Sequence, residues 1–244
     1  MKIIRYTNFL SFCIILTFCY NTLCNSQDFN FLNIKWTDSP DELIKKIKRS
    51  GVGIAYLVKN TEGKPYATNL FCLFPTREYV DENKYKYLES NSFHYTSDED
   101  IKKIGYSPYV KVISMNGVGH SPIDSANFFF SYSSNILLGY SIKLGAKCTE
   151  DESEDRSDRV YSGKTKCIGY SSMYEGLVEK YGKPSWFLSR SEKWQEKDQS
   201  LYYHCMDPTI FLIYMSDKNI ENHISNFKAA LKKHENKIVS KQWQ

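Results

Sequence analysis

Residues 39–51 read SPDELIKKIKRSG and carry the clearest fold signal in the chain. Ser39 can cap a helix, Pro40 suits the first helical position, and Glu42 completes a capping box with Ser39. Apolar residues recur at helical spacing between Leu43 and Ile47. Gly51 follows, and glycine commonly terminates helices. The stretch therefore predicts a short amphipathic helix.

Three further segments carry the same kind of signal. Residues 97–104 begin with an acidic Ser-Asp-Glu-Asp sequence and stop before a glycine. Residues 172–181 start at Ser172, have Glu175 three positions on, and end at Gly182. Residues 217–233 place apolar side chains at helical spacing, at Ile220, Ile224, Phe227 and Leu231. We expect a helix in each segment.

Strands are expected between these helices, because the intervening segments are rich in Tyr, Phe and Ile and are bounded by turn residues. The expected strands are 31–35, 53–59, 66–74, 109–115, 127–132, 136–144, 159–170, 185–189, 201–205 and 209–215. The helices are too few to connect every pair of strands in a parallel sheet. The sequence therefore predicts an α+β fold, with antiparallel sheets and a few short capped helices packed on one face.

The helix at 40–50 and the helix at 172–181 resemble each other. Each has Ser at the cap, Glu three positions later, and a glycine followed by predicted strands. This similarity suggests a duplicated helix-plus-sheet unit. On that reading the region 27–244 divides into halves at 27–107 and 108–244.

Two stretches resemble a loose group of small exported bacterial proteins of unknown function. The first is FLNIKW at 31–36 followed by SPDEL at 39–43, and the second is LVEKYGKP at 177–184. Thr37 stands where that group usually has glycine. The group is similar to the beta-lactamase-inhibitor and outer-membrane-assembly lipoprotein folds, in which helices pack on an antiparallel sheet. The resemblance implies an α+β binding or assembly module and carries over no catalytic residue.

Composition describes an ordinary folded chain. Of 244 residues, 41% are hydrophobic and 25% are charged, which excludes a disordered or collagen-like protein. The formal net charge of +4 is too small to indicate a nucleic-acid partner.

Residues 1–26 have the pattern of a secretory signal peptide. Lys2 and Arg5 precede an apolar run from Phe9 to Tyr20, which is too short to span a bilayer as a helix. We therefore expect a secreted or periplasmic protein whose exported region is 27–244, without a transmembrane span in the mature chain.

Four cysteines lie in the exported region, and an even number in such a chain favours disulfides. Three connectivities are open. Because Cys148 and Cys167 flank one acidic loop we pair them, which leaves Cys72 with Cys205. Close pairs of the kind used by zinc sites are missing, so we expect no metal and no cofactor.

Catalytic templates fit poorly. Gly119-His120-Ser121-Pro122 resembles a nucleophile elbow, but Ile123 occupies the position that requires glycine. His120 and Ser121 remain the only catalytic candidates, and a turn between strands is the simpler interpretation.

Aromatic residues make up 15% of the chain. Such residues are enriched at interfaces, so Trp36, Trp186 and Trp194 are candidates for a protein- or sugar-binding face. They also fill antiparallel strands. The sequence favours a non-enzymatic module that binds another protein or a cell-envelope component. The alternatives are a secreted hydrolase with a site assembled from distant residues and a small-ligand or sugar-binding protein.

Overall fold

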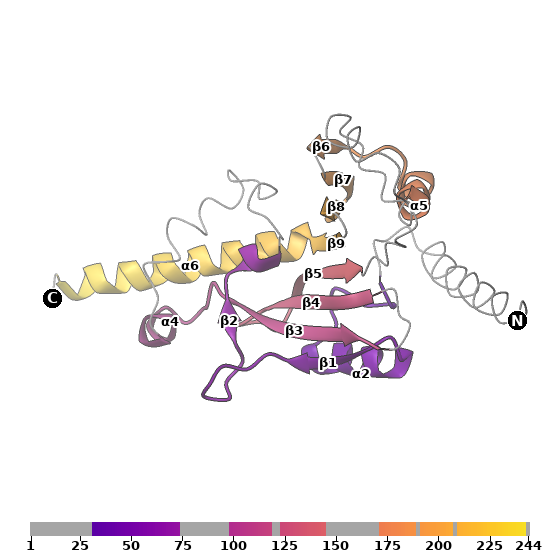
Figure 1. The fold of residues 1–244 in the computed structure, drawn as a ribbon. Coiled ribbons are helices and arrows are strands. Elements are labelled where there is room, and N and C mark those ends of the chain that lie inside the picture. Colours follow the sequence, from indigo (N-terminus) through magenta and orange to yellow (C-terminus); the bar gives the residue numbers. More distant parts are fainter. Residues whose placement is uncertain are drawn as a thin grey trace, which may run out of the picture.

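The computed structural model describes residues 31–73, 98–118, 123–144, 171–188, 191–206 and 209–242. Figure 1 shows one twisted sheet with helices around it and the long C-terminal helix running out at one end. The mixed α and β composition predicted from the sequence is confirmed.

Among these residues, nine strands form a single sheet, and every pairing described in it is antiparallel. The strands are β1 (Gly53–Leu57), β2 (Ala67–Thr68), β3 (Val110–Gly117), β4 (Ile123–Ser131), β5 (Leu137–Leu144), β6 (Trp186–Leu188), β7 (Ser191–Glu196), β8 (Gln199–Met206) and β9 (Thr209–Ser216). Their order is β1-β3-β4-β5-β9-β8-β7-β6, and β2 pairs with β3 beside β1. β5 and β9 therefore lie at the centre.

In the described residues, four α-helices and one 3-10 turn accompany the sheet. They are α2 (Pro40–Ser50), η1 (Leu70–Leu73), α4 (Asp98–Ile104), α5 (Ser171–Tyr181) and α6 (Asp217–Gln242). Within these described segments, no helix combines the length and the apolar character needed to cross a membrane.

The predicted cap of α2 is present. The backbone N–H of Ser39 donates to Glu42 Oε2 at 2.8 Å, and the N–H of Glu42 donates to Ser39 Oγ at 3.4 Å. Gly51 ends the helix in the left-handed conformation, with φ of 70°, which glycine adopts without steric cost. The amphipathic stripe then buries Leu43 and Ile47 against the sheet.

One face of the sheet carries an apolar core that extends from β1 to β7. α2 covers it with Leu43 and Ile47, and α5 covers it with Leu177. Between the two helices, the aromatic ring of Tyr140 on β5 stacks on that of Tyr214 on β9, with 4.7 Å between ring centroids. We call this side of the sheet the helix-covered face.

The opposite face has a second core, which covers only part of it. η1 contributes Leu70 and Leu73, and the first turns of α6 contribute Ile220 and Ile224. Packing of the helices on one face is therefore not confirmed, because α6 belongs to the second core. Further along α6, Phe227 packs against α4.

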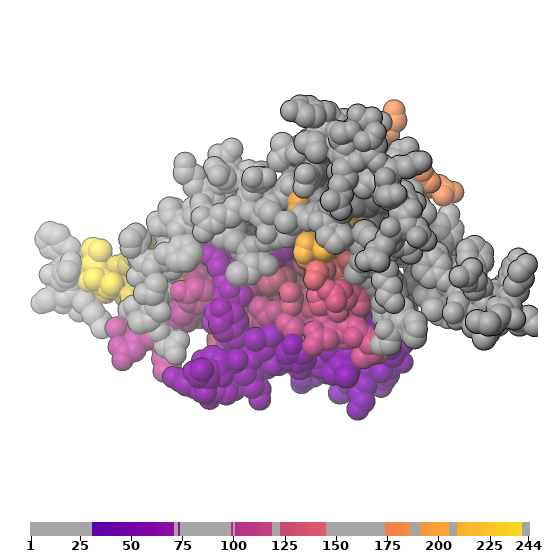
Figure 2. Space-filling view, viewed as in Figure 1, coloured from indigo at the N-terminus to yellow at the C-terminus, as the bar shows by residue number. Residues whose placement is uncertain are grey.

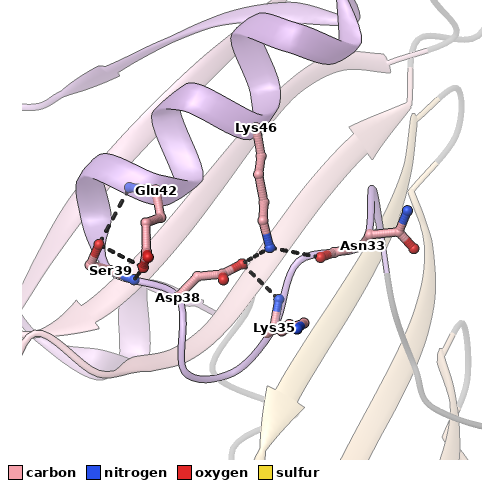
Figure 3. Close-up of polar contacts among 6 residues, drawn as sticks. All are labelled: Asn33, Lys35, Asp38, Ser39, Glu42 and Lys46. Atoms are coloured by element: carbon pink, nitrogen blue, oxygen red, sulfur yellow. Dashed lines mark hydrogen bonds and ion pairs between the residues drawn. The ribbon is translucent and has the colours of Figure 1, made fainter.

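A turn at residues 31–38 joins α2 to the centre of the helix-covered face. Figure 3 shows its main tie: Asp38 accepts from the backbone N–H of Lys35 at 2.8 Å and from Lys46 Nζ on α2 at 2.6 Å. Lys46 also donates to the carbonyl of Asn33 at 2.9 Å. The N–H of Phe31 donates to the hydroxyl of Tyr140.

Several predicted elements differ from the structure. The strand expected at 31–35 is a turn, because Leu32 and Asn33 both have a positive φ of 54°. The strand expected at 66–74 is only β2 followed by η1, and β7 was not predicted at all. α6 extends to residue 242 instead of 233. The strand expected at 159–170 lies outside the described residues.

Candidate functional site

The side of the sheet opposite the helix-covered face is called the second face here. Polar side chains gather on the part of it that η1 and α6 do not cover. Side chains alternate between faces along a strand. Along β3, β4 and β5, the residues that alternate in sequence with those buried under the helix-covered face therefore point to the second face. Six of these positions are polar: Ser114, Asn116, Ser125, Asn127, Ser141 and Lys143. We call these six residues the polar face.

The strand register aligns the polar face in two rows. Asn116 lies opposite Ser125, which lies opposite Lys143. In the next row, Ser114 lies opposite Asn127, and Asn127 lies opposite Ser141. The six side chains therefore form one continuous patch across three neighbouring strands.

Hydrogen bonding orders this patch, and its charge is balanced. The hydroxyl of Ser114 donates to Asn127 Oδ1 at 2.7 Å. Lys143 forms an ion pair with Asp124 at 2.7 Å, and both side chains remain partly exposed. Because that pair is neutral overall, the patch offers hydroxyl and amide groups and little net charge.

Towards the other end of β3, β4 and β5, the next row on this face consists of Val112, Phe129 and Gly139, and there η1 covers the sheet. Gly139 shows how closely η1 approaches, since a Cβ at this position would lie 2.7 Å from Leu73 Cδ2. Phe129 and Val112 are buried beside it. Figure 2 shows magenta and pink atoms, the colours of β3 to β5, reaching the surface beside the purple atoms of the N-terminal part of the described chain.

Apolar and aromatic side chains continue both polar rows. At the β1 end, Ile54 lies opposite Asn116 and Tyr56 lies opposite Ser114. They are 67% and 47% exposed, respectively. At the other end, the half-buried Phe211 lies opposite Lys143. The polar face therefore has an exposed rim of Ile54 and Tyr56.

A serine and a histidine contact each other on the second face, at the β7–β8 end of the sheet. The side chain of Ser191 on β7 lies 2.6 Å from Nδ1 of His204 on β8. A nucleophile must reach its substrate, but these residues are only 1% and 2% exposed. The pair therefore supports packing of the β7–β8 hairpin and gives no argument for a hydrolase.

A second buried histidine connects α6 to the sheet. His223 Nε2 lies 3.0 Å from the carbonyl of Pro108, so this nitrogen carries the proton and donates. Nδ1 then accepts from the hydroxyls of Tyr106 and Ser131, each at 3.1 Å. Burial lowers the pKa of His223 from its ordinary value, which keeps the ring neutral.

A partly buried acid and phenol join α5 to β7. The hydroxyl of Tyr174 bonds to Glu192, and burial together with this bond raises the pKa of Tyr174 to about 12. Burial also raises the pKa of Glu192. The ring of Tyr174 contacts those of Trp194 and Tyr203. These contacts dock α5 on the sheet.

The predicted tryptophans occupy different environments. Trp194 is only 2% exposed, and its indole N–H donates to the carbonyl of Gly182 at 2.9 Å. Trp36 is half-buried and lies against Tyr140, with 5.6 Å between ring centroids. Trp186 lies on β6, but its side chain is outside the described part.

The remaining predicted site residues lie outside the described part of the chain. This applies to His120, Ser121, Cys148 and Cys167. It applies also to the side chains of Cys72 in η1 and Cys205 in β8, which belong to described elements. Both disulfides and the catalytic candidates His120 and Ser121 therefore stay predictions. Across the described ranges, no three His, Cys, Asp or Glu side chains are grouped to hold a metal.

Sequence reasoning missed the polar face and both histidine contacts. Ser191 and His204 are equally distant from the β7–β8 turn at 197–198, so a hairpin prediction would have paired them. The polar face had a local signal as well, since Ser114 and Asn116 alternate with Ile113 and Met115.

The chain matches no family model, and neither a curated protein nor a solved structure shows significant similarity to it. The suspected relation to small exported bacterial proteins therefore stays a prediction.

Proposed function

We propose that this chain is an exported, non-enzymatic binding module that recognises a protein or cell-envelope component through the polar face. The observation that carries the proposal is the contrast within one side of the sheet. Its apolar end is covered by η1 and α6, whereas no described helix packs over Asn116 and Asn127, which are exposed.

The chemistry of the polar face suits recognition of a polar, uncharged surface. Ser and Asn side chains both donate and accept hydrogen bonds. The one cation, Lys143, is already paired with Asp124. Tyr56 adds an exposed aromatic ring with a hydroxyl at the rim, a residue type enriched in interfaces. A partner with exposed backbone or hydroxyl groups would match this arrangement.

Export and disulfides form part of the proposal and rest on the sequence. Their support is the basic-then-apolar pattern at 1–26 and the even number of cysteines after it. Intact mass of protein from the native host, before and after reduction and alkylation, tests both. Export and two disulfides require loss of residues 1–26 and no alkylation until reduction, then four alkylated thiols.

We also propose that the fold derives from a duplicated helix-plus-sheet unit. In its support, α2 precedes β1, β3, β4 and β5, which are neighbours in that order with the two-residue β2 added beside β1, and α5 precedes β6, β7, β8 and β9, which are also neighbours in chain order. Both helices pack on the helix-covered face and are followed by left-handed glycines, Gly51 and Gly182. The division then falls between 144 and 171, since a division at 107/108 would separate β1 from its partner β3.

Site-specific cross-linking tests the binding role. A photo-reactive amino acid replaces Asn127 on the polar face or, as a control, the exposed Asn236 on α6. Incubation with the envelope or extracellular fraction of the host should give a discrete cross-linked species from position 127 and none from 236.

Competition makes the test specific. Excess unlabelled wild-type protein should abolish the cross-link, while protein carrying Asn116→Arg and Asn127→Arg should need at least about tenfold more. The Asn236→Arg variant is the matched control and should compete like wild type. If the protein with Asn116→Arg and Asn127→Arg competes as well as the Asn236→Arg control, the polar face is excluded as the binding surface.

A further inference from the structure

The exposed edge of β1 concentrates apolar surface. Seven large hydrophobic side chains are exposed in the described part of the chain, and four of them lie at this edge: Ile54, Tyr56, Tyr66 and Val118. Tyr66 and Val118 flank β1, because their N–H groups donate to the carbonyls of Val58 and Val52. Long apolar edges favour pairing with another strand.

The backbone of β1 is available for such pairing at two residues. The N–H of Val58 donates to the carbonyl of Val112 on β3, and the carbonyl of Val52 accepts from the N–H of Val118, which follows β3. In an antiparallel ladder the alternate residues Ala55 and Leu57 therefore direct their N–H and C=O groups away from β3. Ala55 and Leu57 are half-buried, whereas Gly53 is buried and Lys59 already forms a β-bridge with Pro65. Ala55 and Leu57 are thus the usable pair.

We propose that β1 pairs antiparallel with β1 of a second copy of this chain, about a two-fold axis at Tyr56. In this register Ala55 of one copy exchanges two hydrogen bonds with Leu57 of the other, and the symmetry repeats them. The small Ala55 side chain lies opposite the large Leu57. On the other face Tyr56 meets its own counterpart, and such aromatic cross-strand pairs stabilise sheets.

Charge favours a second copy as the occupant. β1 has the sequence GIAYL and contains no charged residue, so self-pairing creates no repulsion within the strands. α2 packs along β1, and a two-fold axis makes the two α2 helices antiparallel. Each has Asp41 and Glu42 in its first turn and Lys48 and Arg49 in its last, so ends of opposite charge come together.

The dimer does not rest on the proposed binding role, and its test is separate. The full chain is examined by sedimentation and light scattering in reducing buffer. Wild type should have twice the monomer mass. Ala55→Pro removes only an outward N–H and should weaken the dimer at least about tenfold, because proline is tolerated on edge strands. Ile54→Lys, at an exposed position, tests the same edge if the proline variant fails to fold.

Cysteine cross-linking reports the register. In this register the two copies of residue 56 face each other as a pair without mutual hydrogen bonds, and such pairs have Cα atoms about 4.5 Å apart. A disulfide can bridge that distance. Tyr56→Cys should therefore form covalent dimers on mild oxidation faster than Tyr66→Cys, since both tyrosines are 47% exposed but only Tyr56 lies on the axis. Wild type gives the background from native cysteines. A monomer up to about 100 µM, or equal cross-linking of the two variants, would overturn the proposal.

Discussion

Replacing Asp38 with alanine should release the turn at 31–38 from α2. The Asp38 side chain is 8% exposed and accepts from the N–H of Lys35 and from Lys46. Hydrogen bonds to charged groups contribute about 1.5–3 kcal/mol each. Lys46 keeps 29% of its side chain exposed and so recovers hydration. We therefore expect a loss of about 2 kcal/mol in the free energy of unfolding.

Urea titration followed by tryptophan fluorescence measures this loss, and a thermal melt should show a decrease of about 4–8 °C for a chain of this size. Asp38→Asn retains an acceptor for the Lys35 N–H and removes the charge, so it should cost less than Asp38→Ala. In a double-mutant cycle, Lys46→Met should cost less once Asp38 is already alanine, and the remaining cost should reflect the hydrogen bond from Lys46 to the carbonyl of Asn33.

Glu62→Ala is the matched control. Glu62 also pairs with a lysine, at 2.9 Å from Lys64, but both side chains are more than 60% exposed. Exposed ion pairs contribute little to stability, because water screens the charges. If Asp38→Ala costs no more than Glu62→Ala, or if the Lys46 cycle shows no coupling, then the anchoring role assigned to Asp38 is refuted.

Three further predictions concern the core and its histidine. Phe227→Ala should lower the free energy of unfolding by about 3–5 kcal/mol because the ring is fully buried, while truncating the exposed Ile238 to alanine should change it by less than about 0.5 kcal/mol; urea midpoints compare them. Gly139→Ala should cost about 1–3 kcal/mol, because the new Cβ would lie 2.7 Å from Leu73 Cδ2 and 2.8 Å from the carbonyl oxygen of Tyr214, and a Gly139→Ala/Leu73→Ala double variant should recover only the part of the loss that comes from the Leu73 side chain. Stability should fall as the pH drops below about 6.5, because the lowered pKa of His223 lets the unfolded chain bind the proton first; a His223→Gln variant with an unchanged pH profile would contradict this.

Local signals predicted the helices well because their determinants are adjacent in sequence. The Ser39–Glu42 box and the Gly51 terminator both act within a few residues, and both are confirmed. The strand expected at 31–35 failed for the opposite reason. Its turn is held by Tyr140, more than a hundred residues away, and by Lys46 of the following helix. Alternating apolar residues cannot reveal such contacts.

The polar face was only half visible in the sequence. The alternation of Ser114 and Asn116 with apolar neighbours predicts two faces for β3. Which residues stand beside them depends on strand register, which shifts at an irregularity between Ile123 and Ser125. The aromatic residues were the stronger signal for a binding face in the sequence. Trp194, however, is buried in the core, where its ring packs against Tyr174 of α5 and stabilises the docking of that helix.

Solvent exposure alone does not account for the residue types on the polar face. Exposed positions favour charged side chains, and 25% of the chain is charged. Yet the two exposed positions of the polar face, 116 and 127, both hold Asn, and three of its four half-buried positions hold Ser. Asn is also depleted in strands, so Asn116 and Asn127 cost intrinsic strand stability. Lys or Thr would solvate the same surface at lower cost. A neutral hydrogen-bonding surface maintained against strand preference is therefore better explained by selection for a contact than by selection for solubility.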